Sequence, residues 1–129
     1  MNLIGRHKRR WRAYKTELGR CPVEDFLDEL PEEDFIEVAA AMKEVQLDGL
    51  LAARHVRGDI YEVRAEGKDV IYRILFATEG RRRQVLLSLE AFEKKTRETP
   101  QAKIEVAQQR LNDWRTRGAD RERKRRLDT

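Results

Sequence analysis

The sequence predicts an α+β fold, in which an N-terminal helical hairpin and a C-terminal helix pack against an antiparallel sheet. Three observations support this fold class. Residues 58–95 contain three segments of strand character separated by turns. Residues 22–48 carry apolar residues at helical spacing, and a further helical pattern follows Pro100. We therefore expect a single domain over residues 1–118, followed by a basic, flexible tail over residues 119–129.

The chain begins with a polar and basic stretch. Residues 1–10 contain little that could pack against a core, so we expect an extended lead-in. Residues 11–16 then alternate Trp11 and Ala13 with Arg12 and Tyr14, the period of two that is typical of a strand. We expect this strand at an edge of the sheet.

The helical hairpin is predicted from two apolar stripes separated by a proline. Pro22 suits the first position of a helix, Pro31 ends that helix and begins the next, and Gly49 suits the end of the second. Residues 50–56 are expected to connect the hairpin to the sheet. The expected core positions are Val23, Phe26, Leu27 and Leu30 in the first helix, and Phe35, Val38, Met42 and Val45 in the second.

The sheet is predicted from strands over residues 60–65, 70–77 and 84–92. The middle segment is apolar on both faces except at Arg73, which indicates a central strand covered on both sides. Gly67 is expected to supply a positive φ in the turn before it.

A buried arginine is costly unless it is paired or faces a wet cleft. Arg73 therefore has two interpretations. It forms a salt bridge to Glu62 or Glu90 across the sheet, or it belongs to a site for an anion.

The C-terminal helix is expected to begin with Thr99 as N-cap and Pro100 as its first residue. Gly118 is expected to close it. Its apolar stripe consists of Ile104, Ala107, Leu111 and Trp114.

Composition and charge limit the function. Charged residues make up 40% of the chain, the formal net charge is +4, and the first twenty residues contain seven Lys or Arg against one acid. Such a distribution suits a polyanion such as RNA or DNA, or an acidic protein, although an ordinary solvated surface has the same composition. The single Cys21 fits a reducing compartment. With neither a membrane span nor a signal peptide, we expect a cytoplasmic protein that does not bind membranes.

No motif points to a metal or a cofactor. Zinc-ligand spacing and a glycine-rich phosphate loop are both absent from the sequence. Asp59 with Glu66 and Lys68 faintly resembles a metal-dependent nuclease pattern, but the spacing is short. His55 is a candidate general base, or simply a surface residue in a connecting segment.

Three motifs together resemble a known family. They are a Gly58-x-x-x-Glu62-x-Arg64 strand, a Tyr72-Arg73 strand, and Phe92-x-Lys94-Lys95-Thr96 followed by Thr99-Pro100. In this order they resemble the HigB/RelE-type toxins of bacterial type II toxin–antitoxin systems, and in particular the phage-related HigB-like branch. The resemblance covers roughly residues 11–117.

The resemblance implies a RelE/ParE-like sheet and an endoribonuclease that cleaves messenger RNA on the ribosome. Because the sequence has no metal-ligand cluster, we expect this cleavage to need neither metal nor cofactor. It also implies a helix-turn-helix antitoxin as partner, with operator DNA bound only through the antitoxin complex. The family's catalytic roles fall on Arg64, Arg73, Lys94 and Lys95. RNA contacts are expected from Phe92 and, on the basis of charge, from Arg81, Arg82 and Arg83.

The chemistry of these residues is compatible with such a reaction. RNA can be cleaved by its own 2′-OH, provided that the enzyme holds the phosphate and moves protons. Arg64 and Arg73 suit the phosphate, because a guanidinium binds it in bidentate fashion. Lys94 or Lys95 could transfer a proton, and Phe92 could stack on a base. Alternatively, Phe92 belongs to the core and the lysines are solvated.

Two other functions stay open at this level. One is a ParE-like toxin that inhibits DNA gyrase, in which the cations would not be catalytic. The other is a non-catalytic module that binds nucleic acid or an antitoxin.

Overall fold

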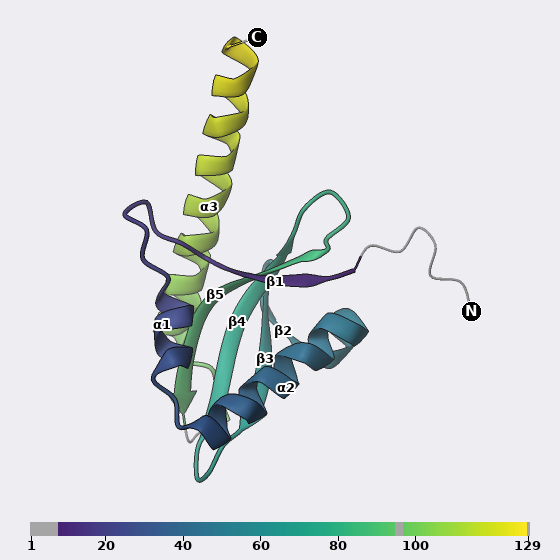
Figure 1. Cartoon of the computed structure of the whole chain (residues 1–129), viewed down its shortest axis with the longest axis vertical. Coiled ribbons are helices and arrows are strands. Elements are labelled where there is room, and N and C mark those ends of the chain that lie inside the picture. The colour runs from purple at the N-terminus through teal and green to yellow at the C-terminus, as the bar shows by residue number, and fades with distance from the viewer. Residues whose placement is uncertain (1–7, 95–96, 129) are drawn as a thin grey trace, which may run out of the picture.

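The computed structural model describes residues 8–94 and 97–128. The protein is a three-layer α+β fold, in which one sheet lies between helices α1 and α2 on one face and helix α3 on the other (Figure 1). The elements in chain order are β1 (Arg10–Ala13), α1 (Pro22–Asp28), α2 (Glu32–Asp48), the 3-10 turn η1 (Gly49–Ala52), β2 (Arg54–Arg57), β3 (Ile60–Glu66), β4 (Ile71–Glu79), β5 (Val85–Lys94) and α3 (Gln101–Leu127).

The sheet has five strands in the order β1-β5-β4-β3-β2. Strands β3 to β5 form the predicted antiparallel meander with β4 in the middle, and β2 adds an unpredicted antiparallel strand beyond β3. The expected edge strand β1 is present, but it pairs with β5 in parallel. Strand β2 was expected to be a connecting segment. It is only four residues long and mostly exposed, so it carries no alternating apolar signal.

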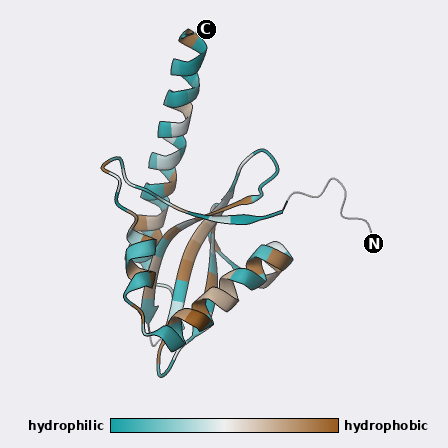
Figure 2. Cartoon of the chain, viewed as in Figure 1, coloured by the Kyte–Doolittle hydropathy of each residue, from teal (hydrophilic) through white to brown (hydrophobic). Residues whose placement is uncertain are grey.

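Two apolar cores lie on the two faces of the sheet. Helices α1 and α2 cover the face that carries Val63, Tyr72 and Ile74, whereas α3 covers the face that carries Leu75 and Leu87. In Figure 2 the hydrophobic colour lies mainly on the strands and on the parts of the helices that cover them. A hairpin in which α1 and α2 also pair with each other stays a prediction.

A bulge between β4 and β5 changes which side chains share a face. Leu75 pairs with Glu90 while Phe76 pairs with Ser88, so Leu89 is an extra residue in β5. Leu89 packs in the core under α3, and Glu90 also contacts residues of α3. The bulge therefore turns both neighbouring side chains toward the same helix.

Two details of the expected fold are wrong for local reasons. Phe35 does not pack in the core, because 41% of its surface is exposed and the buried face of α2 is formed by Asp34, Val38 and Val45. The positive φ in the turn before β4 belongs to Asp69. Gly67 is required instead because a Cβ there would lie 2.5 Å from a ring carbon of Tyr72.

Both ends of α3 differ from the expectation. Pro100 is the N-cap and the helix begins at Gln101, since the hydroxyl of Thr99 bonds elsewhere. Gly118 does not end the helix, which continues to Leu127 because the following residues are good helix formers that make ion pairs one turn apart. The flexibility of residues 119–129 stays a prediction.

Candidate functional site

Strand register places three of the predicted residues in one row. Arg64 of β3 pairs with Arg73 of β4, and Arg73 pairs with Phe92 of β5. All three lie on the face of the sheet that α3 covers, near the beginning of that helix. The arginines of two predicted strands, Arg64 and Arg73, therefore lie side by side on one face of the sheet.

The centre of this region is the carboxylate of Glu62, whose side chain is fully buried. Its Oε2 lies 2.9 Å from Nη2 of Arg54 and 3.1 Å from Nε of Arg64. Its Oε1 accepts a hydrogen bond of 2.6 Å from the hydroxyl of Thr99 and lies 3.7 Å from Nε of Arg73. One negative charge is thus surrounded by three arginines. We call these five residues the Glu62 cluster.

Within this cluster Arg73 is the deepest residue. Its side chain is fully buried, and its Nη1 donates a hydrogen bond of 3.4 Å to Oγ1 of Thr99. Burial lowers the pKa of Arg73, and the nearby Arg64 and Arg54 lower it further, whereas Glu62 opposes the shift. Of the two interpretations, the salt bridge to Glu62 is therefore present. Contact between Arg73 and an anion is not tested by this geometry.

The other two arginines reach the surface. The side chain of Arg54 is 56% exposed and that of Arg64 is 35% exposed. Nη2 of Arg64 also donates a hydrogen bond of 2.8 Å to the carbonyl of Arg97. Since Glu62 neutralises only one of the three guanidinium groups, the mouth of the cluster is cationic and can accept an anionic ligand.

The remaining catalytic candidates lie next to this row. Lys94 pairs with Ile71, two residues along β4 from Arg73 and therefore on the same face of the sheet, and is half-buried. Lys95 lies outside the described residues. Phe92 is buried in the core, with Nζ of Lys103 5.4 Å from the centre of its ring. Phe92 therefore belongs to the core, as one of the two interpretations has it, and its stacking on an RNA base stays a prediction.

A second buried carboxylate flanks the cluster. Glu90 lies 3.3 Å from Nζ of Lys103 and 3.2 Å from Nη1 of Arg110, both on α3. Four residues of this region were not predicted as site residues: Arg54, Thr99, Lys103 and Arg110. A signal for Arg54 would have been the pairing of residue 54 with residue 62 across a tight β2–β3 turn.

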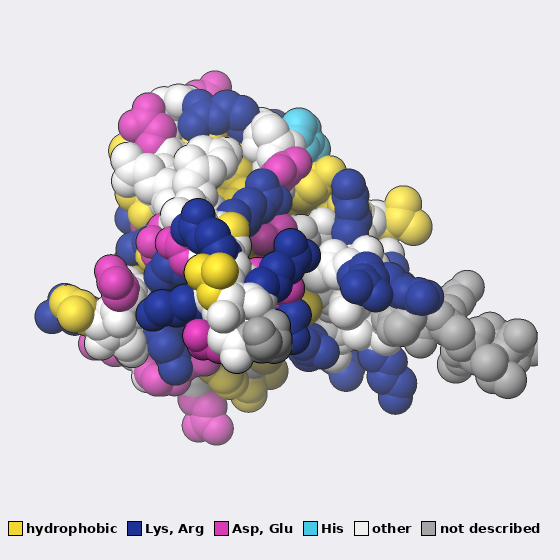
Figure 3. Space-filling model, turned by 90° about the horizontal axis from the view of Figure 1, so that it is seen from above, with side chains coloured by type: hydrophobic (Ala, Val, Ile, Leu, Met, Phe, Trp, Pro, Cys, Tyr) yellow, Lys and Arg dark blue, Asp and Glu magenta, His cyan; other side chains and the backbone are white. Residues whose placement is uncertain are grey.

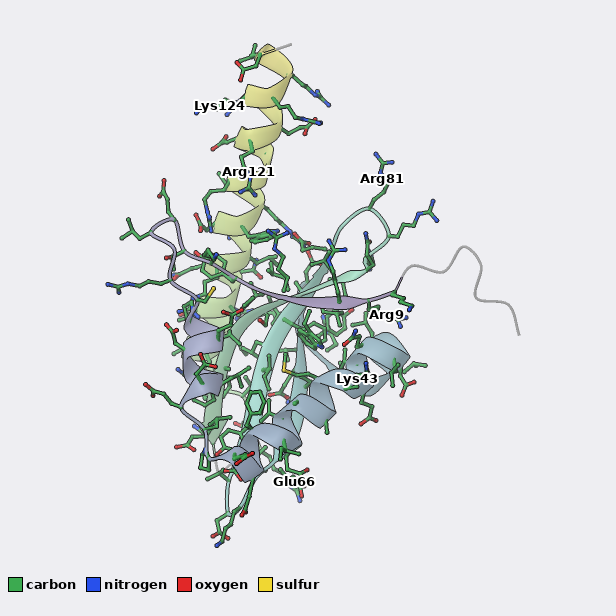
Figure 4. The ribbon with its side chains drawn as sticks, in the orientation of Figure 1. Arg9, Lys43, Glu66, Arg81, Arg121 and Lys124 are labelled. Carbon is green, nitrogen blue, oxygen red and sulfur yellow. The ribbon has the colours of Figure 1, made fainter. Side chains whose placement is uncertain are left out.

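The expected RNA contacts Arg81, Arg82 and Arg83 are not part of this site. They lie in the β4–β5 turn, at the opposite end of the sheet from the row of Glu66, Ile71 and Lys94. Figure 4 shows Arg81 on a loop on the far side of the sheet from Glu66. Along β4 alone, Arg73 and Glu79 are about 20 Å apart.

The residues of the two alternative chemistries, the metal-dependent pattern and the histidine base, do not come together in a site either. Asp59 and Glu66 lie at opposite ends of β3, about 20 Å apart, and Asp59 pairs with Arg115. His55 packs against Tyr61, on the face opposite the Glu62 cluster, and its Nε2 lies 2.8 Å from the carbonyl of Gly58. Within residues 8–94 and 97–128, no three His, Cys, Asp or Glu side chains form a candidate metal site.

Fold and site together define a small α+β protein whose sheet presents a cationic cluster, suited to a phosphate-bearing ligand, beside the start of its last helix. Residues 25–112 match the model of the family described as phage derived protein Gp49-like (DUF891), and the chain belongs to this family.

Two curated relatives carry the name probable endoribonuclease HigB1, from two strains of Mycobacterium tuberculosis, CDC 1551 / Oshkosh and H37Rv. Each is 30% identical to this chain over 108 residues, which cover 81% of this chain and 84% of the relative. The resemblance to HigB-like toxins is thereby confirmed. In the described part of the chain, no helix is long and apolar enough to cross a bilayer.

Proposed function

We propose that this protein is the toxin of a type II toxin–antitoxin system and an endoribonuclease that cleaves messenger RNA on the ribosome. The observation that carries the proposal is the Glu62 cluster, with three arginines around one carboxylate in a chain that is 30% identical to a probable endoribonuclease. The fold proposed with it is the RelE/ParE-like arrangement, including the N-terminal helical hairpin.

The proposed reaction is an internal transfer. The 2′-oxygen of a nucleotide attacks the adjacent phosphorus, a bond between these atoms forms, and the bond from phosphorus to the 5′-oxygen breaks. The attacking hydroxyl loses a proton and the leaving oxygen gains one. In the transition state the phosphate gains negative charge, which fixed cations stabilise more strongly than water does.

The role that we propose for each arginine of the cluster depends on how exposed its side chain is. Arg54 and Arg64 reach the surface and would bind the non-bridging oxygens of the phosphate. Arg73 is buried and would act on them indirectly, by holding Glu62 and Thr99 in place. Lys94 or Lys95 would transfer a proton.

The proposed dependence on the ribosome rests on the lack of a strong general base among the described residues near the Glu62 cluster. Of the described residues, His55 is the only histidine, and it lies on the other face of the sheet. A lysine with an ordinary pKa near 10.4 is a poor base at neutral pH. We therefore propose that the ribosome aligns the message for attack and that the reaction needs neither metal nor cofactor. The protein would act in the cytoplasm, and a helix-turn-helix antitoxin would neutralise it and link it to operator DNA.

The experiment that tests the proposal is primer extension on messenger RNA translated by purified ribosomes, together with incorporation of labelled methionine in cells. Wild-type protein should cut the translated message and stop translation, and Arg64→Ala and Arg54→Ala should each do so at least tenfold more slowly. Arg57→Ala, an exposed arginine of β2, is the matched control and should retain activity. Inhibition of DNA supercoiling with normal translation would instead identify a gyrase inhibitor. A protein that inhibits neither translation nor supercoiling would be a non-catalytic binding module.

A further inference from the structure

The C-terminal half of α3 extends away from the rest of the protein. Trp114 is the last residue of the helix that packs against the core, and every residue from 119 to 128 is exposed. The thirteen residues from 115 to 127 therefore form a helix of about 20 Å beyond the core, and Figure 1 shows it projecting above the sheet. This half also lies beyond residues 25–112, which match the family model.

The extension has the composition of a surface that binds a polyanion. Residues 117–127 contain six Lys or Arg and two acids, so their net charge of +4 equals the formal net charge of the whole chain. Only Ala119 and Leu127 are apolar, which leaves no apolar stripe against which a protein helix could pack. In Figure 2 this half of α3 is almost entirely hydrophilic.

The cations of the extension are not equivalent. Arg117 pairs with Asp113, Arg123 pairs with Asp120, and Arg125 and Arg126 pair with Glu122. In the part of the chain that the structure describes, Arg121 and Lys124 take part in no such ion pair. Arg117, Arg121 and Lys124 follow one another at i, i+4 and i+7, so they share one face of the helix.

This face continues onto β1 at the base of the extension. A cleft of about 360 Å³ lies between β1, the start of α1 and α3, and four cations (Arg12, Lys15, Arg117 and Arg121) and one acid (Glu24) are among the residues that line it. The guanidinium of Arg12 lies 5.0 Å from the centre of a Trp114 ring. A neighbouring cleft shares Arg117 and Arg121 and adds Lys124. Seen from above, Lys and Arg side chains are prominent over this end of the molecule (Figure 3).

The base of the helix is fixed by two contacts from the segment after β1. The hydroxyl of Tyr14 donates a hydrogen bond of 2.6 Å to Asp113, and Nη2 of Arg117 donates one of 2.5 Å to the carbonyl of Lys15. These contacts set the direction of the extension relative to the sheet. The base of the cationic face is therefore held in a defined orientation.

We infer that β1 and the projecting half of α3 form a docking surface for the sugar-phosphate backbone of a folded RNA. The surface is distinct from the Glu62 cluster, and the inference rests on the proposed function in that it assigns RNA rather than DNA as the polyanion. Its cations neutralise phosphates, and the cleft at its base adds Arg12 and Lys15 to those of the helix. The surface thereby holds the substrate complex while the Glu62 cluster acts on the scissile phosphate.

The test compares two double variants of the full-length protein. Arg121→Gln/Lys124→Gln removes two charges from the proposed face, and Arg125→Gln/Arg126→Gln removes two that pair with Glu122 on the same helix and line neither cleft. Glutamine is about as good a helix former as arginine or lysine, and circular dichroism verifies that the helix is retained. Binding to a labelled RNA stem-loop, to a DNA duplex of matching sequence and to purified ribosomes is measured over a series of salt concentrations.

The first variant should bind the stem-loop and the ribosome at least tenfold more weakly, and its salt dependence should fall by about 1.5 in log–log slope, as expected for two lost phosphate contacts. The second variant should change affinity less than threefold. Equal losses in both variants, or none in either, would overturn the inference, as would equally tight binding to the DNA duplex. RNA binding that depends on this face in a protein that cleaves nothing would refute the proposed function and leave the docking surface standing.

Discussion

Thr99 donates a hydrogen bond of 2.6 Å to the buried carboxylate of Glu62, although the two residues are 37 positions apart in the chain. The same hydroxyl lies 3.4 Å from Nη1 of Arg73. The segment before α3 is thus tied to the charges in the middle of the sheet. A ligand that draws Arg54 or Arg64 away from Glu62 would also alter the contact that holds the start of α3.

This arrangement predicts that the charge of Glu62 is essential for stability. Glu62→Gln preserves the volume of the side chain but leaves the guanidinium of Arg73 buried with its anionic partner removed. The loss should be about 3–5 kcal/mol in the free energy of unfolding, measured by urea denaturation. Glu66→Gln, at the exposed end of β3, is the control and should change stability by about 0.5 kcal/mol or less. Similar values for the two variants would mean that the cluster does not stabilise the fold.

A second prediction concerns the pH dependence of stability. Burial raises the pKa of Tyr72 to about 12, and its hydrogen bond to Asp34 contributes further. Because the folded pKa is above that of the unfolded chain, the neutral phenol stabilises the fold fully below pH 10, and this contribution is lost as the pH rises to 12. Tyr72→Phe should therefore be less stable at pH 8 by about 1–3 kcal/mol, and the difference should narrow toward pH 12.

The measurement is thermal unfolding of both proteins between pH 8 and pH 12. Burial also raises the pKa of Tyr14, but this residue is present in both proteins, so its effect cancels in the difference. A difference that stays constant over this range would show that the ionisation of Tyr72 is not coupled to folding.

A third prediction uses the glycine in the middle of α3. A Cβ at Gly118 would meet no atom within 4 Å, and the helix passes through this residue. Gly118→Ala should raise the free energy of unfolding by up to about 1 kcal/mol, because glycine costs that much relative to alanine in a helix interior. Helix content should stay the same or rise. Gly67→Ala is the opposite case, since its Cβ would lie 2.5 Å from Tyr72, and it should destabilise the protein. Circular dichroism with urea denaturation compares the two, and a destabilised Gly118→Ala variant would contradict a continuous helix.

The parts of the fold that the sequence predicted are those with strong periodicity. The strands around Val63, Ile74 and Leu87 and the three helices have clear apolar patterns. Strand β2 was missed because it is a short, exposed edge. The bulge at Leu89 was missed because its extra residue is itself apolar, so the alternation is interrupted without any polar residue to mark it.

The same limits explain the site. Arg64, Arg73 and Glu62 could be named because each stands within a predicted strand. Arg54 and Thr99 could not be assigned to the site from the sequence, because their positions depend on the register of an unpredicted strand and on the exact start of α3. Arg81 to Arg83 were included on charge alone, and charge does not say at which end of a sheet a turn will lie.

The last prediction concerns the proton transfer assigned to Lys94 or Lys95. Arginine retains the positive charge of lysine but stays protonated at any pH an enzyme meets. If one lysine transfers the proton, its replacement by arginine should lower single-turnover cleavage on programmed ribosomes by about 10²-fold or more. Binding to the ribosome should change little, because the charge is unchanged.

The other lysine of the pair, which only contacts phosphate, should tolerate arginine but lose affinity in a salt-dependent way when replaced by alanine. Lys103→Arg is the matched control, because Lys103 lies over Phe92 and pairs with Glu90 without an assigned part in the chemistry. If Lys94→Arg and Lys95→Arg both cleave normally, the two lysines are electrostatic contacts. The search for a base would then move to Glu90, Glu93 or His55. Glu90 is the first to test because it faces α3 as Arg73 does, whereas Glu93 pairs with Tyr72 and His55 packs against Tyr61, both of the opposite face.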